Sequence, residues 1–244
     1  MIVFLHGVPE TAALWDGVRS HLDVESVALS LPGFGGPRPD GFGATKDEYV
    51  AWVLSELDRI DGPIDLVGHD WGAGFTYRIA TAHGERLRSW VVDVGNIMHP
   101  DYAWHAFAQI WQTPGDGEAY FEQQAATPVE VRAEGLAGLG IPIADAEVMA
   151  AAADDTMSGC ILDLYRSSTP NLAALWPAEG PTSAPGMVVC PSADPFGDET
   201  MSRQVAEQRG ARHQVLDGLG HWWVVEDPAR AAAVLTEFHA SVAG

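Results

Sequence analysis

A carboxylate stands at the centre of the most informative stretch of this sequence. Asp70 lies in Gly68-His69-Asp70-Trp71-Gly72, after a short apolar run and before a helical pattern. The two glycines permit a sharp turn between a strand and a helix, which exposes the central side chain. The N–H groups at the start of that helix stabilise an ionised carboxylate. An aspartate that only caps the helix is the plainer interpretation, but the motifs described below favour a nucleophile that forms an ester on attacking carbon.

Hydrolysis of such an ester needs a general base, and histidine is the side chain whose pKa suits neutral pH. His221 follows the last apolar run, between Gly220 and a final helix. Asp194 follows the preceding apolar run, and we expect its carboxylate to orient the histidine, with Asp198 and Asp93 as rivals. The order nucleophile, acid, histidine is that of one known class of hydrolytic triads.

Short apolar runs alternate with amphipathic helical patterns, which predicts a parallel sheet flanked by helices. The predicted strands are Ile2–Leu5, Ser26–Leu31, Ile64–Val67, Ser89–Val94, Met187–Cys190 and Gln214–Leu216. The predicted helices are Ala12–Leu22, Lys46–Arg59, Gly72–Ala82, Thr200–Gln208 and Pro228–Ala240. In such sheets, ligands bind at the carboxyl ends of the strands.

One region breaks this alternation. Between residues 97 and 185 no convincing strand occurs, and prolines separate the helical stretches. We place these stretches near Ala103–Trp111, Ala119–Gln124 and Ile143–Arg166. The sequence therefore predicts a helical lid, or cap, of residues 97–185, inserted into an α/β core of residues 1–96 and 186–244.

Three motifs resemble those of the α/β-hydrolase superfamily, and within it the epoxide hydrolases and haloalkane dehalogenases. They are Gly68-His69-Asp70-Trp71-Gly72-Ala73, Leu5-His6-Gly7-Val8-Pro9-Glu10 and Gly220-His221-Trp222. The resemblance implies an α/β-hydrolase fold with a triad of Asp70, Asp194 and His221. It also implies an oxyanion hole made by the backbone N–H groups of Val8 and Trp71. A cis bond before Pro9 is part of the same family pattern.

The start of the chain departs from the family pattern. Relatives usually carry an N-terminal β-hairpin before the first motif, whereas this chain starts with the strand of that motif. We therefore expect about six strands, with Ser26–Leu31 at an edge of the sheet. An exposed edge invites pairing with a second copy, so a homodimer is one expectation. A truncated product with impaired activity is the alternative.

The two chemistries of this group differ in how the leaving group is stabilised. Opening an epoxide creates an alkoxide, for which family members use lid tyrosines. The segment Ile161–Arg166 resembles one that carries such a tyrosine, so Tyr165 is the expected ring-opening acid; a tyrosine that only packs the lid is the alternative. The second expected tyrosine is replaced by Phe107, with Tyr102 five residues earlier.

Release of a halide instead needs two N–H donors and no proton. Trp71 matches one indole donor of the dehalogenases, and Trp104, Trp111 or Trp176 would provide a second. Val8, however, stands where many dehalogenases carry an asparagine donor. We therefore favour epoxide hydrolysis, with haloalkane dehalogenation as the alternative and a non-catalytic small-molecule binder third.

The composition of the chain limits the classes of molecule that it is expected to bind. The formal charge of −21 disfavours nucleic acid and anionic membranes. No run of apolar residues is long enough to span a bilayer, no leader is evident, and no metal or cofactor motif occurs, so we expect a cytoplasmic protein without a cofactor. Cys160 and Cys190 fit buried small hydrophobes. The expected partners are water and a small hydrophobic substrate, an epoxide or a haloalkane, in a site lined by Phe107, Trp104, Trp111 and Pro9.

Overall fold

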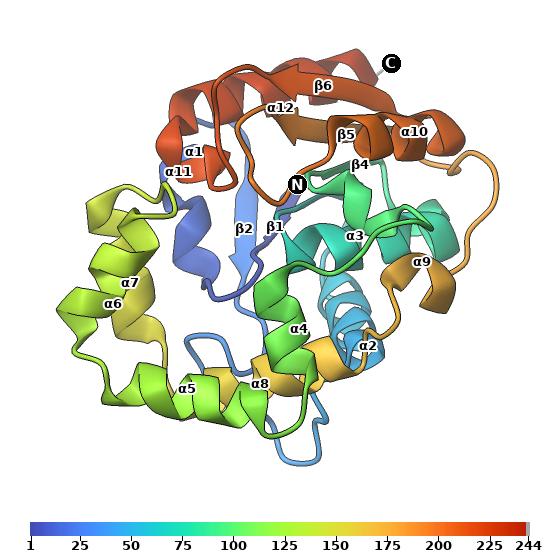
Figure 1. The fold of residues 1–244 in the computed structure, drawn as a ribbon. Helices are drawn as coiled ribbons and strands as arrows, with labels where there is room; N and C mark the ends of the chain where they lie inside the picture. The colour runs from blue at the N-terminus through green and yellow to red at the C-terminus, as the bar shows by residue number, and fades with distance from the viewer. Residues whose placement is uncertain (243–244) are drawn as a thin grey trace.

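A six-stranded parallel sheet forms the centre of the molecule in the computed structural model, which describes residues 1–242 (Figure 1). The strand order is β2-β1-β3-β4-β5-β6, and every adjacent pair is parallel. The strands are β1 (Ile2–Leu5), β2 (Ser26–Leu29), β3 (Asp65–Gly68), β4 (Ser89–Val92), β5 (Gly186–Pro191) and β6 (Arg212–Leu216). The predicted six-stranded sheet is therefore confirmed, with the strand ends shifted by a few residues.

Alternate residues of the strands face two separate hydrophobic layers, because successive side chains of a strand point to opposite faces. Val3, Leu66 and Val188 pack with α2 (Lys46–Leu57), α3 (Trp71–Ala82) and α10 (Glu199–Arg209). Ile2, Val67 and Val189 pack on the other face with η1 (Ala12–Trp15), α1 (Asp16–Ser20) and α12 (Pro228–Val242). Burial on both faces explains why the central strands are apolar throughout.

β2 lies at one edge of the sheet, as predicted for this segment, and β6 lies at the other edge. All four residues of β2 are partly exposed, whereas β1, β3, β4 and β5 are buried along their whole length. Pairing of two copies through β2 stays a prediction.

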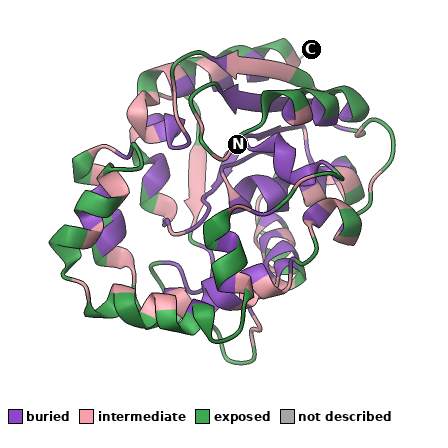
Figure 2. Cartoon of the chain, viewed as in Figure 1, coloured by how far each residue is buried: buried purple, intermediate pink, exposed green. Residues whose placement is uncertain are grey.

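All the chain between β4 and β5 is helical or irregular, as predicted. It contains η3 (Gly95–Met98), α4 (Ala106–Gln112), α5 (Asp116–Ala126), α6 (Val129–Ala137), α7 (Ile143–Ala152), α8 (Asp155–Arg166) and α9 (Leu172–Leu175). In Figures 1 and 2, α4, α5, α6, α7 and α8 lie away from the sheet, whereas η3 contacts β5 and α10. This arrangement leaves the carboxyl ends of the strands facing the inserted segment.

The prediction of one helix over Ile143–Arg166 is wrong. The chain turns out of helical geometry at Ala153, and α8 starts afresh after Asp154, whose carboxylate accepts the N–H of Met157 at 2.8 Å. A side-chain cap of this kind satisfies an N–H that has no partner within the helix. The two helices can therefore run in different directions, and α8 buries Ile161, Leu164 and Tyr165.

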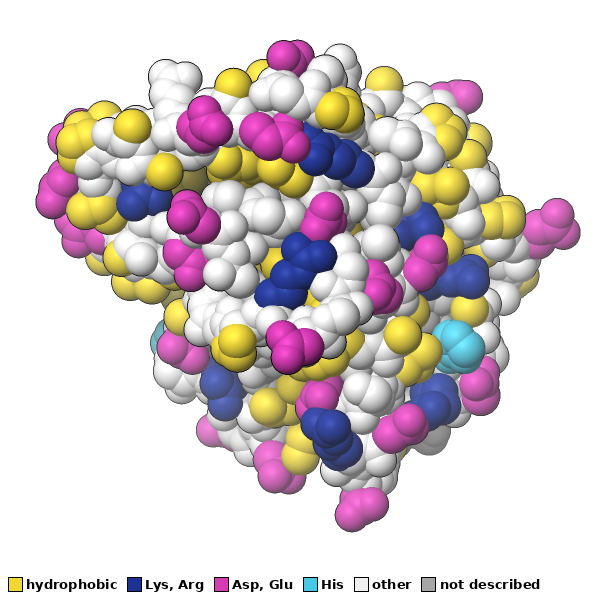
Figure 3. Space-filling view, turned by 90° about the horizontal axis from the view of Figure 1, so that it is seen from below, with side chains coloured by type: hydrophobic (Ala, Val, Ile, Leu, Met, Phe, Trp, Pro, Cys, Tyr) yellow, Lys and Arg dark blue, Asp and Glu magenta, His cyan; other side chains and the backbone are white. Residues whose placement is uncertain are grey.

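Acidic side chains outnumber basic ones over the surface seen in Figure 3, in keeping with the net charge. Cys160 and Cys190 are both buried, as predicted, and form no disulfide. Within residues 1–242, every helix is too short or too polar to cross a bilayer.

Candidate active site

Asp70 occupies a strained turn between β3 and α3. Its backbone has φ 51° and ψ −119°, a conformation that costs a non-glycine residue about 1–3 kcal/mol. A Cβ on Gly68 would collide with the backbone of Gly72, and one on Gly72 would collide with the carbonyl of Leu5. Glycine is therefore required on both sides, so the turn brings the carboxylate of Asp70 above the sheet, at the start of a 12-residue helix.

The two carboxylate oxygens of Asp70 have different surroundings. Oδ1 accepts the backbone N–H of Val8 at 2.8 Å, whereas Oδ2 lies 3.9 Å from Nε2 of His221. Burial raises the pKa of the Asp70 carboxyl to about 6, although its side chain keeps 19% of its surface exposed. At neutral pH the group is thus ionised, with one oxygen bound and the other free to react.

His221 is bound to Asp194. Nδ1 of the imidazole lies 3.0 Å from Oδ2 of Asp194, and the other carboxylate oxygen accepts the N–H of Phe196 at 2.8 Å. Burial disfavours the charged forms, but this contact raises the pKa of His221 and lowers that of Asp194. The pair therefore fixes the imidazole with Nε2 toward Asp70, as expected for a general base.

The rival carboxylates have other partners. Asp198 caps α10 by accepting the N–H of Met201 at 2.8 Å. Asp93, after β4, accepts the N–H of Asp70 at 2.9 Å and the indole N–H of Trp223 at 2.7 Å. The structure thus brings Asp194, and neither rival, against His221.

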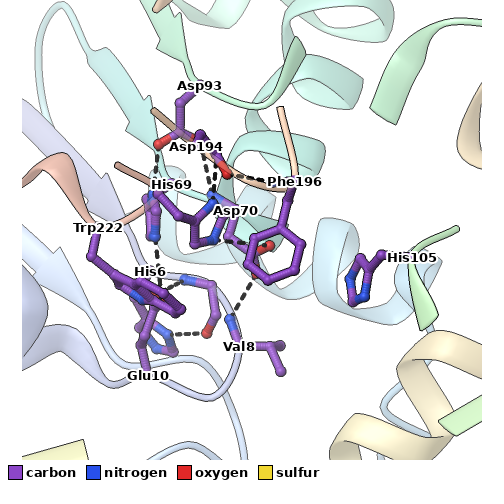
Figure 4. A network of polar contacts seen from close by, with 12 residues as sticks. His6, Val8, Glu10, His69, Asp70, Asp93, His105, Asp194, Phe196 and Trp222 are labelled. Carbon is purple, nitrogen blue, oxygen red and sulfur yellow. Dashed lines mark hydrogen bonds and ion pairs between the residues drawn. The ribbon is translucent and has the colours of Figure 1, made fainter. Parts of the chain in front are cut away.

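A buried histidine lies beneath the reactive groups, between two carboxylates (Figure 4). Nδ1 of His69 is 2.5 Å from Asp93, and Nε2 is 3.2 Å from Glu10. Burial opposes protonation, yet these two charges raise the pKa of His69 well above its ordinary value. The ring lies against that of His221, with centroids 4.8 Å apart. Hence a charged imidazolium holds the two buried carboxylates.

Glu10 joins the first loop to the histidine loop. Its carboxylate accepts the N–H of Gly7 at 2.8 Å and the indole N–H of Trp222 at 2.8 Å. Gly7 and Trp222 lie near opposite ends of the sequence. Burial opposes ionisation, but His69 lowers the pKa of Glu10 to about 2. Glu10 therefore fixes the loop that carries Val8 relative to His221.

Donor atoms of Glu10, His69 and His221 lie within 4.8 Å of one another, close enough for a metal ion. Each of these residues is already paired: His69 with two carboxylates, Glu10 with three donors, and His221 with Asp194. A cation would have to displace these contacts. We therefore interpret the cluster as an ion-pair network and assign no metal to it.

Two cavities, one smaller and one larger, adjoin the carboxylate of Asp70. Both are lined by Asp70, His105, Tyr165, Phe196 and His221. The rest of their walls is mostly aliphatic and aromatic, and neither wall contains Lys or Arg. Such surroundings suit a small, uncharged, apolar ligand.

A model of the alpha/beta hydrolase family matches residues 2–234. The chain belongs to this family. The match spans both halves of the sheet and the inserted helices, so the predicted fold is confirmed.

Curated relatives of this alpha/beta hydrolase family member include proteins of both predicted groups. Haloalkane dehalogenase 1 of Mycobacterium tuberculosis (strain ATCC 25618 / H37Rv) is 32% identical over 123 residues, which cover 44% of the chain and 40% of the dehalogenase. The chain thus spans less than half the length of this relative. Epoxide hydrolase A of the same strain is 24% identical over 288 aligned residues, covering 98% of the chain and 89% of the relative.

Solved structures give the same two groups. Epoxide hydrolase A from Mycobacterium thermoresistibile has a TM-score of 0.77 and 21% identity, covering 97% of this chain and 90% of that chain. An epoxide hydrolase from Vigna radiata has a TM-score of 0.80 and 19% identity, covering 98% of this chain and 90% of that chain. The haloalkane dehalogenase DbeA from Bradyrhizobium elkani has a TM-score of 0.76 and 18% identity, covering 99% of this chain and 90% of that chain. At these identities the likeness concerns the fold.

Tyr165 lines both cavities. Its ring packs edge-on against those of Trp71 and Trp111, with centroids 5.3 and 4.8 Å away. Burial and the charge of Asp70 raise the pKa of the Tyr165 hydroxyl well above its usual range. The hydroxyl therefore keeps its proton at neutral pH.

The other predicted lid residues are divided between the cavities. Trp104 and Tyr102 line the smaller one, and Phe107 and Trp111 line the larger one together with Pro9, which follows a cis bond as predicted.

Of the three indoles considered for a second donor, two are engaged. Trp104 donates to the carbonyl of Ser168 at 3.3 Å and Trp176 to Asp47 at 2.7 Å, whereas the structure gives buried Nε1 of Trp111 no partner within residues 1–242.

Sequence reasoning missed two residues at the junction of the cavities, His105 and Phe196. His105 is the N-cap of α4, and its Nδ1 accepts the N–H of Ala108 at 3.2 Å, so the ring's remaining polar atom is Nε2. Burial lowers the pKa of His105 to about 4, which keeps it neutral. No signal in the sequence singled out His105, because the predicted helical stretch Ala103–Trp111 includes it. Glu10 and His69 stood inside recognised motifs, but nothing in the sequence paired them.

Proposed function

We propose that this hydrolase opens apolar epoxides to vicinal diols through an ester on Asp70. The observation that carries the proposal is the placing of the Asp70 carboxylate between the N–H of Val8 and Nε2 of His221. A carboxylate at this position attacks carbon and forms a covalent intermediate, which water hydrolyses.

Alkylation uses the oxygen that Val8 does not bind. Oδ2 of Asp70 attacks an epoxide carbon, the C–O bond to that carbon breaks, and the Tyr165 hydroxyl donates its proton to the released oxygen. Burial and the Asp70 charge raise the pKa of Tyr165, so its hydroxyl is protonated when the epoxide binds. General acid catalysis of this kind contributes about 10²–10⁴-fold.

Hydrolysis then uses the oxygen that Val8 does bind. In the ester, Oδ1 becomes the carbonyl oxygen, and the Val8 N–H, with that of Trp71 as the proposed second donor, stabilises the oxyanion that forms on it. Nε2 of His221 removes a proton from water as the water attacks Cγ. The carboxylate of Asp194, 3.0 Å from Nδ1, stabilises the resulting imidazolium. The intermediate then collapses: the bond from Cγ to the alkyl oxygen breaks, and that oxygen takes the second proton of the attacking water from the new carboxyl, which releases the diol and restores the Asp70 carboxylate. The proton held by His221 returns to the Tyr165 phenolate.

Residues 97–185 act as the cap in this proposal. Tyr165, Trp104, Trp111 and Phe107 all come from this segment, and the first three are buried against the core. A cap that excludes water keeps the alkylation step apolar, and hydrolysis then needs only one water molecule beside His221.

The proposal is tested by product analysis. Wild-type protein is incubated with an apolar epoxide and, separately, with a bromoalkane of the same chain length, and diol and bromide are measured. Diol without bromide, lost in Asp70→Asn, supports epoxide hydrolysis. Diol formation that survives Asp70→Asn would overturn the aspartate mechanism.

Haloalkane dehalogenation is the second candidate. The indole of Trp111 favours this chemistry. Trp111 lines the larger cavity, and its buried Nε1 has no hydrogen-bond partner within residues 1–242. A halide needs such donors and no proton. Bromide without diol, with a loss in Trp111→Phe, would move the assignment to this chemistry.

A further inference from the structure

The imidazole of His105 is held in one tautomer by the helix that it caps. Its Nδ1 accepts the backbone N–H of Ala108 at 3.2 Å, so this nitrogen carries no proton. Burial and the nearby charge of His221 lower the pKa of His105 to about 4, and the ring is therefore uncharged at neutral pH. A neutral imidazole that accepts at one nitrogen carries its proton on the other, so Nε2 of His105 is an N–H donor.

This N–H group has no acceptor in the part of the chain that the structure describes. The one hydrogen bond of the His105 side chain within residues 1–242 is that of Nδ1. Aromatic rings surround the imidazole, with the centroids of Phe196, Trp111 and Tyr165 at 5.0, 6.2 and 6.3 Å. The imidazole also lines both cavities beside Asp70, so a bound molecule can provide the acceptor that Nε2–H lacks.

The proposed reaction creates such an acceptor close to His105. Asp70 and Tyr165, the nucleophile and the acid, line the same two cavities. The ring of Phe196 lies beside His105 (Figure 4) and contacts His221 as well, with centroids 5.0 and 5.1 Å away. Negative charge develops on the oxygen that leaves the attacked carbon, and fixed N–H donors stabilise charge of this kind.

We propose that the Nε2–H group of His105 is a second hydrogen-bond donor to the oxygen released from the epoxide, alongside the hydroxyl of Tyr165. This inference rests on the proposed function. Tyr165 transfers its proton to that oxygen, whereas His105 donates a hydrogen bond and keeps its proton, because losing it would leave an imidazolate. His105 therefore acts in the formation of the ester on Asp70 and not in its hydrolysis.

The tautomer of His105 is measured by NMR on wild-type protein labelled at the ring nitrogens of histidine. The signals are assigned through the contact of the ring with the backbone N–H of Ala108. At neutral pH we expect an uncharged ring with its proton on Nε2. A proton on Nδ1, alone or in addition to Nε2, would overturn the inference whatever reaction the protein catalyses.

The rate of ester formation tests the donor itself. His105→Asn is the informative substitution, because the oxygen of asparagine still caps α4 while the N–H at the position of Nε2 is lost. It is combined with His221→Gln, which stops the reaction at the ester, and the intact mass is followed after mixing with 1,2-epoxypropane. We expect the ester to form at least about tenfold more slowly than in His221→Gln alone.

His99→Asn in the same background is the matched control. Nδ1 of His99 likewise accepts a nearby backbone N–H, that of Asp101 at 3.1 Å, but His99 lines neither cavity. This substitution should leave the rate of ester formation unchanged. Equal rates in the His105→Asn and His99→Asn proteins would overturn the inference and leave epoxide hydrolysis standing, whereas no ester even in His221→Gln would overturn the proposed function and this inference with it.

A second epoxide separates a lost donor from disturbed packing. In 1,2-epoxy-3,3,3-trifluoropropane the fluorines make the released alkoxide less basic, so it needs a hydrogen-bond donor less. The loss of rate in His105→Asn should therefore be smaller for this epoxide than for 1,2-epoxypropane. An equal loss for both epoxides would show that the substitution only disturbs packing, and would overturn the inference; the tautomer of the wild type decides if His105→Asn fails to fold.

Discussion

The carboxylate of Asp93 binds the backbone N–H of Asp70 at 2.9 Å, so the carboxyl ends of β3 and β4 are joined at the strained turn. Its other oxygen contacts His69 at 2.5 Å. Asp194 instead contacts His221 at 3.0 Å. The two acids thus have separate tasks: Asp93 supports the position of the nucleophile, and Asp194 orients the base.

Asp194→Asn should slow hydrolysis of the ester much more than its formation. Without the carboxylate, the imidazolium formed at His221 loses its partner, and comparable changes lower turnover about 10⁴-fold. We therefore expect the ester to accumulate, as measured by intact mass after mixing with an epoxide. Asp93→Asn is the matched control, and accumulation in that variant alone would exchange the two assignments.

His69→Gln should destabilise the fold. It removes the cation between the buried carboxylates of Glu10 and Asp93, and breaking a buried pair in this way costs about 3–5 kcal/mol. The free energy of unfolding is measured by urea titration at neutral pH. The exposed His21 provides the control His21→Gln, which should change the free energy by less than about 0.5 kcal/mol. Equal effects of the two substitutions would refute the ion-pair network.

Asp70→Asn should stabilise the fold at alkaline pH. Burial raises the pKa of Asp70 to about 6, so the native state binds this proton more tightly than the unfolded chain does. Its contribution is most favourable at low pH and is lost as the pH rises through about 6. The substitution should therefore raise the free energy of unfolding by about 1–3 kcal/mol at pH near 8.

The same substitution should give a smaller gain near pH 4, where the native carboxyl of the wild type is protonated. Urea titrations of both proteins at the two pH values measure the difference. A gain that is the same at both values would show that the buried charge of Asp70 is not its cause.

Tyr165→Phe should lower diol formation by about 10²–10⁴-fold, because the released oxygen loses its proton donor. Steady-state diol release is the measurement, with Tyr102→Phe as the comparison, since Tyr102 lines only the smaller of the two cavities beside Asp70. A larger loss in Tyr102→Phe than in Tyr165→Phe would transfer the role of the acid to Tyr102.

The sheet was predictable from the sequence because its central strands are buried on both faces and therefore read as short apolar runs. The turn at Asp70 was predictable because Gly68 and Gly72 leave few other interpretations. Asp194 and His221 followed from their order after two such runs. The break between α7 and α8 was not predictable from periodicity, since it depends on one capping contact of Asp154.

The buried network was beyond sequence reasoning for a different reason. Glu10, His69, Asp93 and Trp222 are each ordinary in their own segments, and their pairing depends on how the loops meet in space. The same holds for His105 and Phe196, which reach the cavities from the start of α4 and from the loop after β5.

The proposed mechanism requires a covalent bond to Asp70, which His221→Gln should trap. The variant keeps the nucleophile but lacks the base, so mixing it with trans-4,5-epoxyoctane should raise its intact mass by one molecule of epoxide. Peptide mapping should locate the addition at Asp70, and Asp70→Asn in the same background should show none. Diol formation by the wild type without any adduct in His221→Gln, or an adduct on another residue, would contradict the central claim.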